Sequence, residues 1–177
     1  MRLIPDAGER LKEIKKLYKS AFPQNERAPF RLFLKQQKQG ALEVLSIEDE
    51  AFLGLAITFF YRDMVLLEYF AVDPAARSKG VGGQALGLIK KRYPGKRLFL
   101  TIEAVKEGAP DYELRARRKA FYQRNGLVAP GISLVMFGVE MELMTDGSEV
   151  SFAEYCEIYE HIVGKWLMRI LKIRQVQ

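Results

Sequence analysis

A segment near the middle of the chain sets the strongest limit on its fold. Residues 64–72 are apolar and rich in Val, Leu, Tyr and Phe, which is typical of a strand. An Asp-Pro pair ends that pattern, and small and basic residues follow as far as Gly80. From Val81 the apolar residues return at helical spacing, and residues 97–102 again show a strand pattern. The segment 64–102 is therefore predicted to be a strand–helix–strand unit whose two strands pair in parallel.

Antiparallel strands are predicted before this unit, and helices around it. Only short polar turns separate the first three strand candidates, so these should form antiparallel hairpins, because a parallel crossover needs many more residues. The predicted strands cover 42–47, 52–61, 64–72, 97–102 and 132–144, the last with a break near Gly138. The predicted helices cover 9–21, a short segment after Pro29, the segment from Val81, 112–124 and a C-terminal run from 151.

Two of these helices carry further signals. In 112–124, Leu114 is predicted to face inward, and Gly126 follows the helix as its C′ residue. Ser151 and Glu154 have capping-box spacing. The apolar stripe that follows should pack on the domain or on a second copy of the chain in a homodimer, because a free tail rarely exposes such a surface. The stripe contains Phe152, Tyr155, Cys156, Tyr159, Ile162, Val163, Trp166, Leu167 and Ile170.

Length and composition limit the class of protein. The 177 residues fit one domain over 1–177, with 151–177 as a C-terminal helical extension. Cys156 is the only cysteine, which favours a reducing cytoplasm and no cysteine-based metal site. The first residues lack the apolar run of a signal peptide, and no stretch is apolar enough to span a membrane. The net charge of +6 suits polyanions, yet no recognised nucleic-acid motif accompanies it, so neither nucleic acid nor membrane is expected as a partner.

The loop before Val81 has the features of an anion-binding site. Several amides converge where a loop meets a helix N-terminus, and the aligned peptide dipoles place about half a positive charge there. Glycine at 80 and 82 lets the backbone approach a diphosphate without a Cβ in the way. Arg77 and Lys79 add full charges. This is not a Walker loop, because the lysine precedes Gly80 where that motif needs Gly-Lys-Ser/Thr at its end.

Two other interpretations of the loop stay open. The pattern Gly80-x-Gly82-x-x-Ala85 also fits a dinucleotide fingerprint, and Glu103 stands near the expected ribose-binding distance. A nicotinamide-dependent oxidoreductase is disfavoured, because seven residues separate Val72 from Gly80 and the preceding hairpins do not suit an opening βαβ unit. The other interpretation is a glycine-rich strand–helix turn that binds nothing.

These residues resemble the GNAT superfamily of acyltransferases. There, a strand ending in an apolar-Ala-Val-Asp-Pro run leads to Arg/Gln-x-x-Gly-x-Gly/Ala, and Arg77-Ser-Lys-Gly80-Val-Gly82 matches every fixed position. Tyr122-Gln-Arg-Asn-Gly126 resembles the family's Tyr-x-x-x-Gly-Phe, with leucine replacing the last residue. The resemblance runs along most of residues 1–145. It implies an α/β (α+β) fold: a mixed, splayed, largely antiparallel sheet with one central parallel pair, flanked by helices, to which this chain adds a C-terminal helix.

The resemblance also implies a reaction. An acetyl (acyl) group would pass from acetyl-CoA, a co-substrate, to a primary amine of a small molecule or peptide, by direct attack in a ternary complex and without a metal. The alternative is an acyl-CoA-binding sensor of the same fold that performs no turnover. The coenzyme would enter between the strand ending at Val72 and the strand at 97–102. The residues implied in binding it are Phe70, Ala71, Val72, Arg77, Ser78, Lys79, Gly80, Val81, Gly82 and Gly83.

Acyl transfer to an amine needs a neutral amine and a proton for the departing thiolate. Tyr122 matches the family's tyrosine that protonates the thiolate; its other possible role is core packing. Glu68 stands inside an apolar strand, so it is either the general base or the ion-pair partner of an arginine. Glu103 is the second candidate base, or a clamp for a cationic acceptor. Together with Glu26, these carboxylates favour a cationic small amine.

Overall fold

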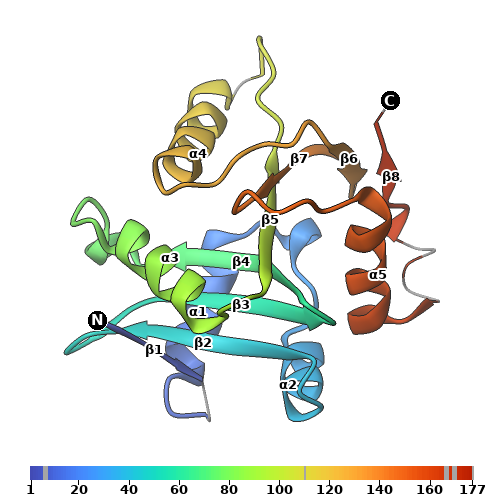
Figure 1. Ribbon diagram of the computed structural model, residues 1–177. Helices are drawn as coiled ribbons and strands as arrows, with labels where there is room; N and C mark the ends of the chain where they lie inside the picture. Colours follow the sequence, from blue (N-terminus) through green and yellow to red (C-terminus); the bar gives the residue numbers. More distant parts are fainter. Residues whose placement is uncertain (6–7, 110, 166–167, 169–170, 177) are drawn as a thin grey trace. The chain divides into compact units, whose positions relative to one another are not determined.

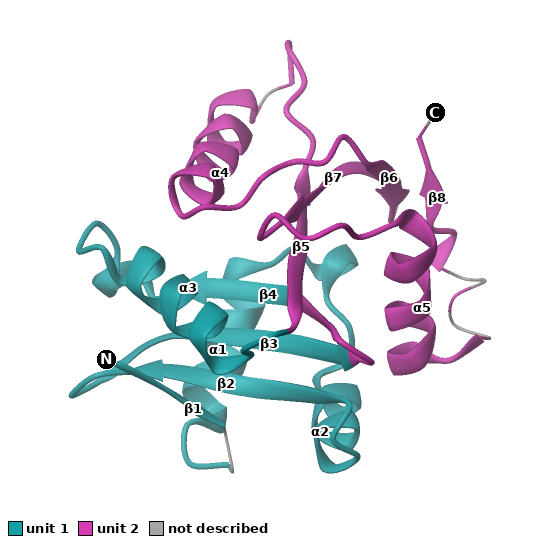
Figure 2. Cartoon of the chain, viewed as in Figure 1, with its two compact units in different colours: residues 1–60, 67–95 teal, residues 61–66, 96–177 magenta. Residues whose placement is uncertain are grey.

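The computed structural model describes residues 1–5, 8–109, 111–165, 168 and 171–176 (Figure 1). The chain divides into two compact units (Figure 2). The first contains residues 1–60 and 67–95, and the second contains residues 61–66 and 96–177. None of the described helices has the length and apolar character that crossing a membrane requires.

The described elements are five helices and eight strands in a mixed sheet. The helices are α1 Leu11–Ala21, α2 Phe30–Lys38, α3 Val81–Arg92, α4 Tyr112–Arg124 and α5 Phe152–Val163, and 3-10 turns cover Gln24–Glu26 and Pro74–Ala76. The strands are β1 Arg2–Pro5, β2 Leu42–Glu48, β3 Phe52–Tyr61, β4 Met64–Val72, β5 Arg97–Glu103, β6 Ser133–Met136, β7 Val139–Thr145 and β8 Arg174–Gln175. Hydrogen-bonded neighbours follow the order β1-β2-β3-β4-β5-β7-β6-β8. The pair β4–β5 is parallel, and β1–β2, β2–β3, β5–β7, β6–β7 and β6–β8 are antiparallel. The predicted mixed α/β fold is confirmed.

In the first unit, α1 and α2 cover one face of the strands through an aromatic cluster. Tyr18 of α1 and Phe33 of α2 are both buried. Their ring centroids lie 4.9 and 5.5 Å from that of Tyr69 in β4. Because both helices contact the same strand residue, they pack on the same side of β4, as the teal unit of Figure 2 shows. These large apolar side chains form the core of this unit.

Gly54 in β3 permits an unusually close approach to the end of β4. A Cβ built at Gly54 would lie 2.4 Å from the carbonyl oxygen of Ala71 and 3.2 Å from the Cα of Val72. No side chain fits at the shorter distance, so only glycine is compatible with this backbone position. The Asp73 amide also donates a 2.8 Å hydrogen bond to the Leu53 carbonyl. The end of β4 is thereby held directly against β3.

In the second unit, the start of β4 pairs with β5 in the register Met64↔Arg97 to Leu66↔Phe99. The break predicted near Gly138 is confirmed: β6 and β7 form a hairpin whose turn places Phe137 and Gly138 at φ of 52° and 78°. Two positive φ values are what a tight hairpin turn requires.

The predicted capping box of α5 is also confirmed. The Glu154 amide donates to the Ser151 hydroxyl at 3.2 Å, and the Ser151 amide donates to the Glu154 carboxylate at 2.9 Å. Four side chains of the helix are buried, and the ring centroid of Tyr155 lies 6.4 Å from that of Phe99 in the same unit. The four buried side chains are Tyr155, Ile158, Tyr159 and Ile162.

Other details differ from the sequence predictions. Leu114 is 52% exposed, so its predicted inward orientation is wrong. The reason is that α4 buries only Tyr122, near its C-terminal end. Cys156, predicted as core, is only half-buried.

The helix of the C-terminal extension is interrupted. α5 ends at Val163, where Gly164 has a φ of 83°, and Lys165, Met168 and Leu171 are again helical. The short strand β8 pairs with β6. The predicted stripe residues Trp166, Leu167 and Ile170 lie outside the described residues. The single domain and the homodimer stay predictions.

Candidate functional site

The loop between β4 and α3 presents main-chain N–H groups at the start of α3, and no helix-capping side chain is hydrogen-bonded to them. Ser78 and Gly80 adopt φ of 63° and 73°, a left-handed conformation that is uncommon for a residue with a Cβ such as serine. Gly80 is the N-cap of α3, and no side-chain capping bond or first-turn acidic residue is found in the described helix. The first-turn N–H groups are therefore available to an anion.

Two predicted cations of this loop have different surroundings. The Arg77 Nε donates to the Val72 carbonyl at 3.2 Å, so this side chain ties the loop back to the end of β4. Lys79 is exposed next to Gly80. The first unit thus contains the whole predicted coenzyme-binding set, Phe70–Val72 and Arg77–Gly83, as one continuous strand end, loop and helix start. This arrangement can bind a diphosphate.

Glu68 is half-buried in β4 between buried Leu67 and Tyr69. Burial raises the pKa of Tyr18 to about 12, and the negative charge of Glu68 contributes to the increase. Burial raises the pKa of Tyr69 well above its usual range, and the charge of Glu68 also raises it. The Glu68 carboxylate therefore lies within electrostatic reach of two buried phenols.

These two tyrosines hold the segment that joins α1 to α2. The Tyr69 hydroxyl donates to the Glu26 carbonyl at 2.7 Å and accepts from the Ala28 amide at 3.4 Å. The Tyr18 hydroxyl donates to the Ala28 carbonyl at 3.1 Å. Neither role is predicted from the sequence. The available signal was that a phenol inside an apolar run needs a hydrogen-bond partner.

Tyr122 lies in the second unit and is 8% exposed. Burial raises the pKa of its hydroxyl to about 12, while the charge of Arg118 acts in the opposite direction. No hydrogen bond of this hydroxyl is found among the described residues. A protonated phenol of this kind can donate a hydrogen bond to a substrate atom.

Glu103, the second candidate base, is held by arginines. It accepts a hydrogen bond from Arg118 and lies 3.4 Å from Arg115, which also pairs with Asp111 at 2.9 Å. Glu103 is therefore an ion-paired residue at the end of β5. Arg115 and Arg118 of α4 are thereby both paired with carboxylates.

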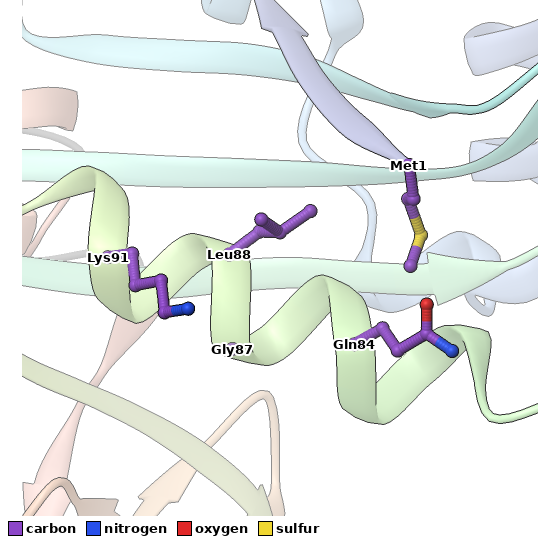
Figure 3. Close-up of a pocket in the computed structure, with 5 residues that line it drawn as sticks. All are labelled: Met1, Gln84, Gly87, Leu88 and Lys91. Atoms are coloured by element: carbon purple, nitrogen blue, oxygen red, sulfur yellow. The ribbon is translucent and has the colours of Figure 1, made fainter.

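A pocket of about 350 Å³ lies on another part of the first unit (Figure 3). Met1 reaches from the start of β1 toward α3, whose Gln84, Gly87, Leu88 and Lys91 share one helical face. None of the predicted site residues is among these five. Within the described chain, no group of three or more His, Cys, Asp or Glu side chains is suited to a metal ion.

Comparisons with known proteins agree with the function that the loop geometry indicates. The model of the acetyltransferase (GNAT) family matches residues 11–127. No curated protein sequence matches the chain. A putative acetyltransferase from the GNAT family of Bacteroides thetaiotaomicron is 21% identical, with a TM-score of 0.73 over 92% of this chain and 97% of that one.

Two structures that contain coenzyme A are also similar. An aminoglycoside 6′-N-acetyltransferase complexed with coenzyme A is 14% identical, with a TM-score of 0.63 over 85% of this chain and all (100%) of that one. A spermidine N-acetyltransferase from Vibrio cholerae, in complex with CoA and spermine, is 13% identical, with a TM-score of 0.63 over 81% and 92% of the two chains. At these identities the likeness concerns the fold.

Proposed function

The chain belongs to the GNAT family of acetyltransferases, and on that premise we propose that it transfers an acetyl group from acetyl-CoA to a primary amine by direct attack in a ternary complex. The observation that carries this proposal is the loop over Arg77–Gly83. The first turn of α3 has neither a side-chain capping bond nor an acidic residue, so its amides lie uncapped at a helix N-terminus. Such a site attracts the diphosphate of a coenzyme.

The chain's own residues divide the work of binding. The amides from Ser78 to Gly83 and the Lys79 ammonium receive the pyrophosphate, while the Arg77 amide donates to the Pro74 carbonyl at 3.4 Å. The backbone of Phe70–Val72 pairs with the amides of the pantetheine arm, as another strand would. Ser78 and Gly80, already in left-handed conformations, support this assignment because the loop need not rearrange to direct its amides outward.

Glu68 acts as the base in this proposal. The acceptor enters as an ammonium and first loses one proton to the Glu68 carboxylate, directly or through water; the neutral nitrogen then attacks the thioester carbonyl carbon. The half-buried position of Glu68 supports the role, because a carboxylate in partly apolar surroundings attracts a cation strongly. The C–S bond then breaks and the thiolate leaves, and the second proton of the attacking nitrogen passes to this thiolate, which gives a neutral amide and the CoA thiol.

Tyr122 assists the departure of the thiolate in this scheme. Its hydroxyl is protonated at neutral pH, because burial raises its pKa to about 12. It can donate to the sulfur on which negative charge develops. The product amide and free CoA are then released.

Calorimetry with acetyl-CoA tests the loop assignment. Gly82→Val places a side chain where the diphosphate must lie and should abolish binding. Gly87→Val is the matched control on the same helix, because a Cβ there meets nothing within 4 Å. Unchanged affinity in a folded Gly82→Val variant would contradict the assignment.

Turnover is tested separately by following thiol release with a panel of amines, polyamines, amino acids and peptides. Release of CoA that depends on the amine supports transfer. Tight acetyl-CoA binding without turnover of any amine would instead favour the sensor alternative.

A further inference from the structure

Arg27 occupies a fixed position between α1 and α2. Its two neighbours along the chain are held by tyrosines: Glu26 through its carbonyl to Tyr69, and Ala28 through both its amide and its carbonyl. These bonds define the main chain on either side of Arg27. The starting point of its side chain is therefore set by the core, which is the kind of support that a binding residue needs.

The guanidinium itself is poorly satisfied. Its Nη1 donates to the Lys19 carbonyl at 3.3 Å, near the long limit of such bonds. Its Nε is buried and has no hydrogen-bond partner, the one such side-chain nitrogen or oxygen in the described part of the chain. Arg27 also forms no ion pair with any described residue. A buried donor without an acceptor is unfavourable and calls for an explanation.

A purely structural role does not explain this arrangement. The Lys19 carbonyl lies in the last turn of α1, where any donor could bond it. A lysine or glutamine would serve without burying an unpaired N–H. The planar guanidinium differs from these side chains in presenting Nε and Nη as a fork that matches the two oxygens of a carboxylate.

Arg27 and Glu68 lie around the same phenol. The charge of Glu68 raises the pKa of Tyr18, and that of Arg27 lowers it, both as smaller effects beside burial. A negative and a positive charge therefore both lie within electrostatic reach of the Tyr18 hydroxyl. An acceptor with an ammonium and a carboxylate would match both charges.

We propose that Arg27 binds a carboxylate of the acceptor, and that the acceptor is an amino acid or a related small amine whose carboxylate lies near the reacting nitrogen. This inference rests on the proposed acetyl transfer, with Glu68 facing the ammonium. The carboxylate accepts from Nε and an Nη, and the long bond to Lys19 lets the side chain turn toward it. This acceptor differs from the purely cationic amine expected from the sequence. Glu103, one of the carboxylates behind that expectation, is already paired with Arg115 and Arg118.

The test compares amino acids with the amines formed by removing their carboxylate. The pairs are phenylalanine and phenethylamine, histidine and histamine, and lysine and cadaverine. Both kcat/KM, from thiol release, and binding to the protein–CoA complex, from calorimetry, are measured. At least one amino acid should exceed its matched amine by about tenfold to a hundredfold, the usual range for charge-assisted hydrogen bonds.

Variants then assign the preference to Arg27. Arg27→Gln should remove the preference by raising KM for the amino acid, while Arg27→Lys should restore part of the preference. Arg31→Gln is the control, because it removes the same charge from an exposed position at the start of α2. It should leave the preference intact.

The outcomes separate this inference from the proposed function. Equal acetylation of amino acids and matched amines by the wild type would overturn the inference and leave acetyl transfer standing. A preference that persists in folded Arg27→Gln would also overturn it. If no amine is acetylated, calorimetry still decides, since amino-acid binding that does not depend on Arg27 refutes the assignment.

Discussion

Replacing Tyr122 with phenylalanine removes one hydroxyl and keeps the ring that packs in α4. Burial raises the pKa of this hydroxyl to about 12, whereas an ordinary tyrosine has a pKa of about 10 and a thiol one of about 8.5. The buried phenol is therefore about 3.5 pKa units less acidic than the thiol that leaves. Complete proton transfer is unfavourable by this margin. We expect the hydroxyl to donate a strong hydrogen bond to the sulfur as charge develops.

The size of the effect follows from that bond. Hydrogen bonds to charged acceptors contribute about 1.5–3 kcal/mol, which corresponds to roughly tenfold to 150-fold in rate. Tyr122→Phe should lower kcat within this range and leave acetyl-CoA affinity within a few-fold. The pH dependence has a definite sign. The donor exists below its pKa, so a pKa of about 12 preserves activity through pH 11, where an ordinary tyrosine would already be ionised.

The assay is single-turnover thiol release between pH 7 and 11, with calorimetry of acetyl-CoA and thermal unfolding of both proteins. Single-turnover conditions ensure that the chemical step is observed and not product release. A full single-turnover rate in the folded variant would refute the donor role. Joint loss of coenzyme binding and stability would instead mean that the hydroxyl serves packing.

Three further predictions concern other groups. Glu68→Gln should lower kcat and change the acidic limb of the pH–rate profile; an unaltered rate and profile would leave Glu68 structural and direct attention to Glu103. Hydrogen bonds from Arg97 hold the pKa of Glu154 at about 2. The ionised Glu154 therefore stabilises the fold above about pH 4.5, and this stabilisation, about 1 kcal/mol given its partial exposure, disappears as pH falls toward 2. Urea unfolding at pH 5 and pH 2 should show a smaller loss of stability in Glu154→Gln than in the wild type, and an equal loss would contradict this. Deleting 151–177 removes four buried side chains of α5 and should abolish cooperative thermal unfolding; an unchanged melting temperature and mass in light scattering would disprove that dependence.

The elements predicted from the sequence are those whose signals are local. The strands at 42–47, 52–61 and 64–72 appear as β2, β3 and β4, because apolar runs and short turns define them without distant partners. The short strands β1 and β8 escaped prediction. β1 pairs Arg2 with Glu48, and such pairing depends on a partner far along the chain.

In the candidate site, too, local features are predicted from the sequence and long-range contacts are not. The loop over Arg77–Gly83 carries its glycines, its cations and its helix start within a few residues, so the sequence predicts it. The surroundings of Arg27 depend on Tyr69, 43 residues away from the Glu26 carbonyl it binds. The pairing of Glu103 with Arg118 likewise joins residues from a strand and the following helix. A single sequence contains no periodic signal for such contacts.

Gly54 has a consequence for how this protein can change over time or by design. The position lies outside the loop and outside every assigned contact with the coenzyme, yet its missing side chain lets the Ala71 carbonyl lie where it does. Even an alanine there must displace the strand end that we assign to the pantetheine arm. Random mutagenesis selected for weak coenzyme binding should therefore recover substitutions at position 54, in a protein whose loop is intact. A grafted or redesigned loop would likewise function only on a chain that keeps this glycine.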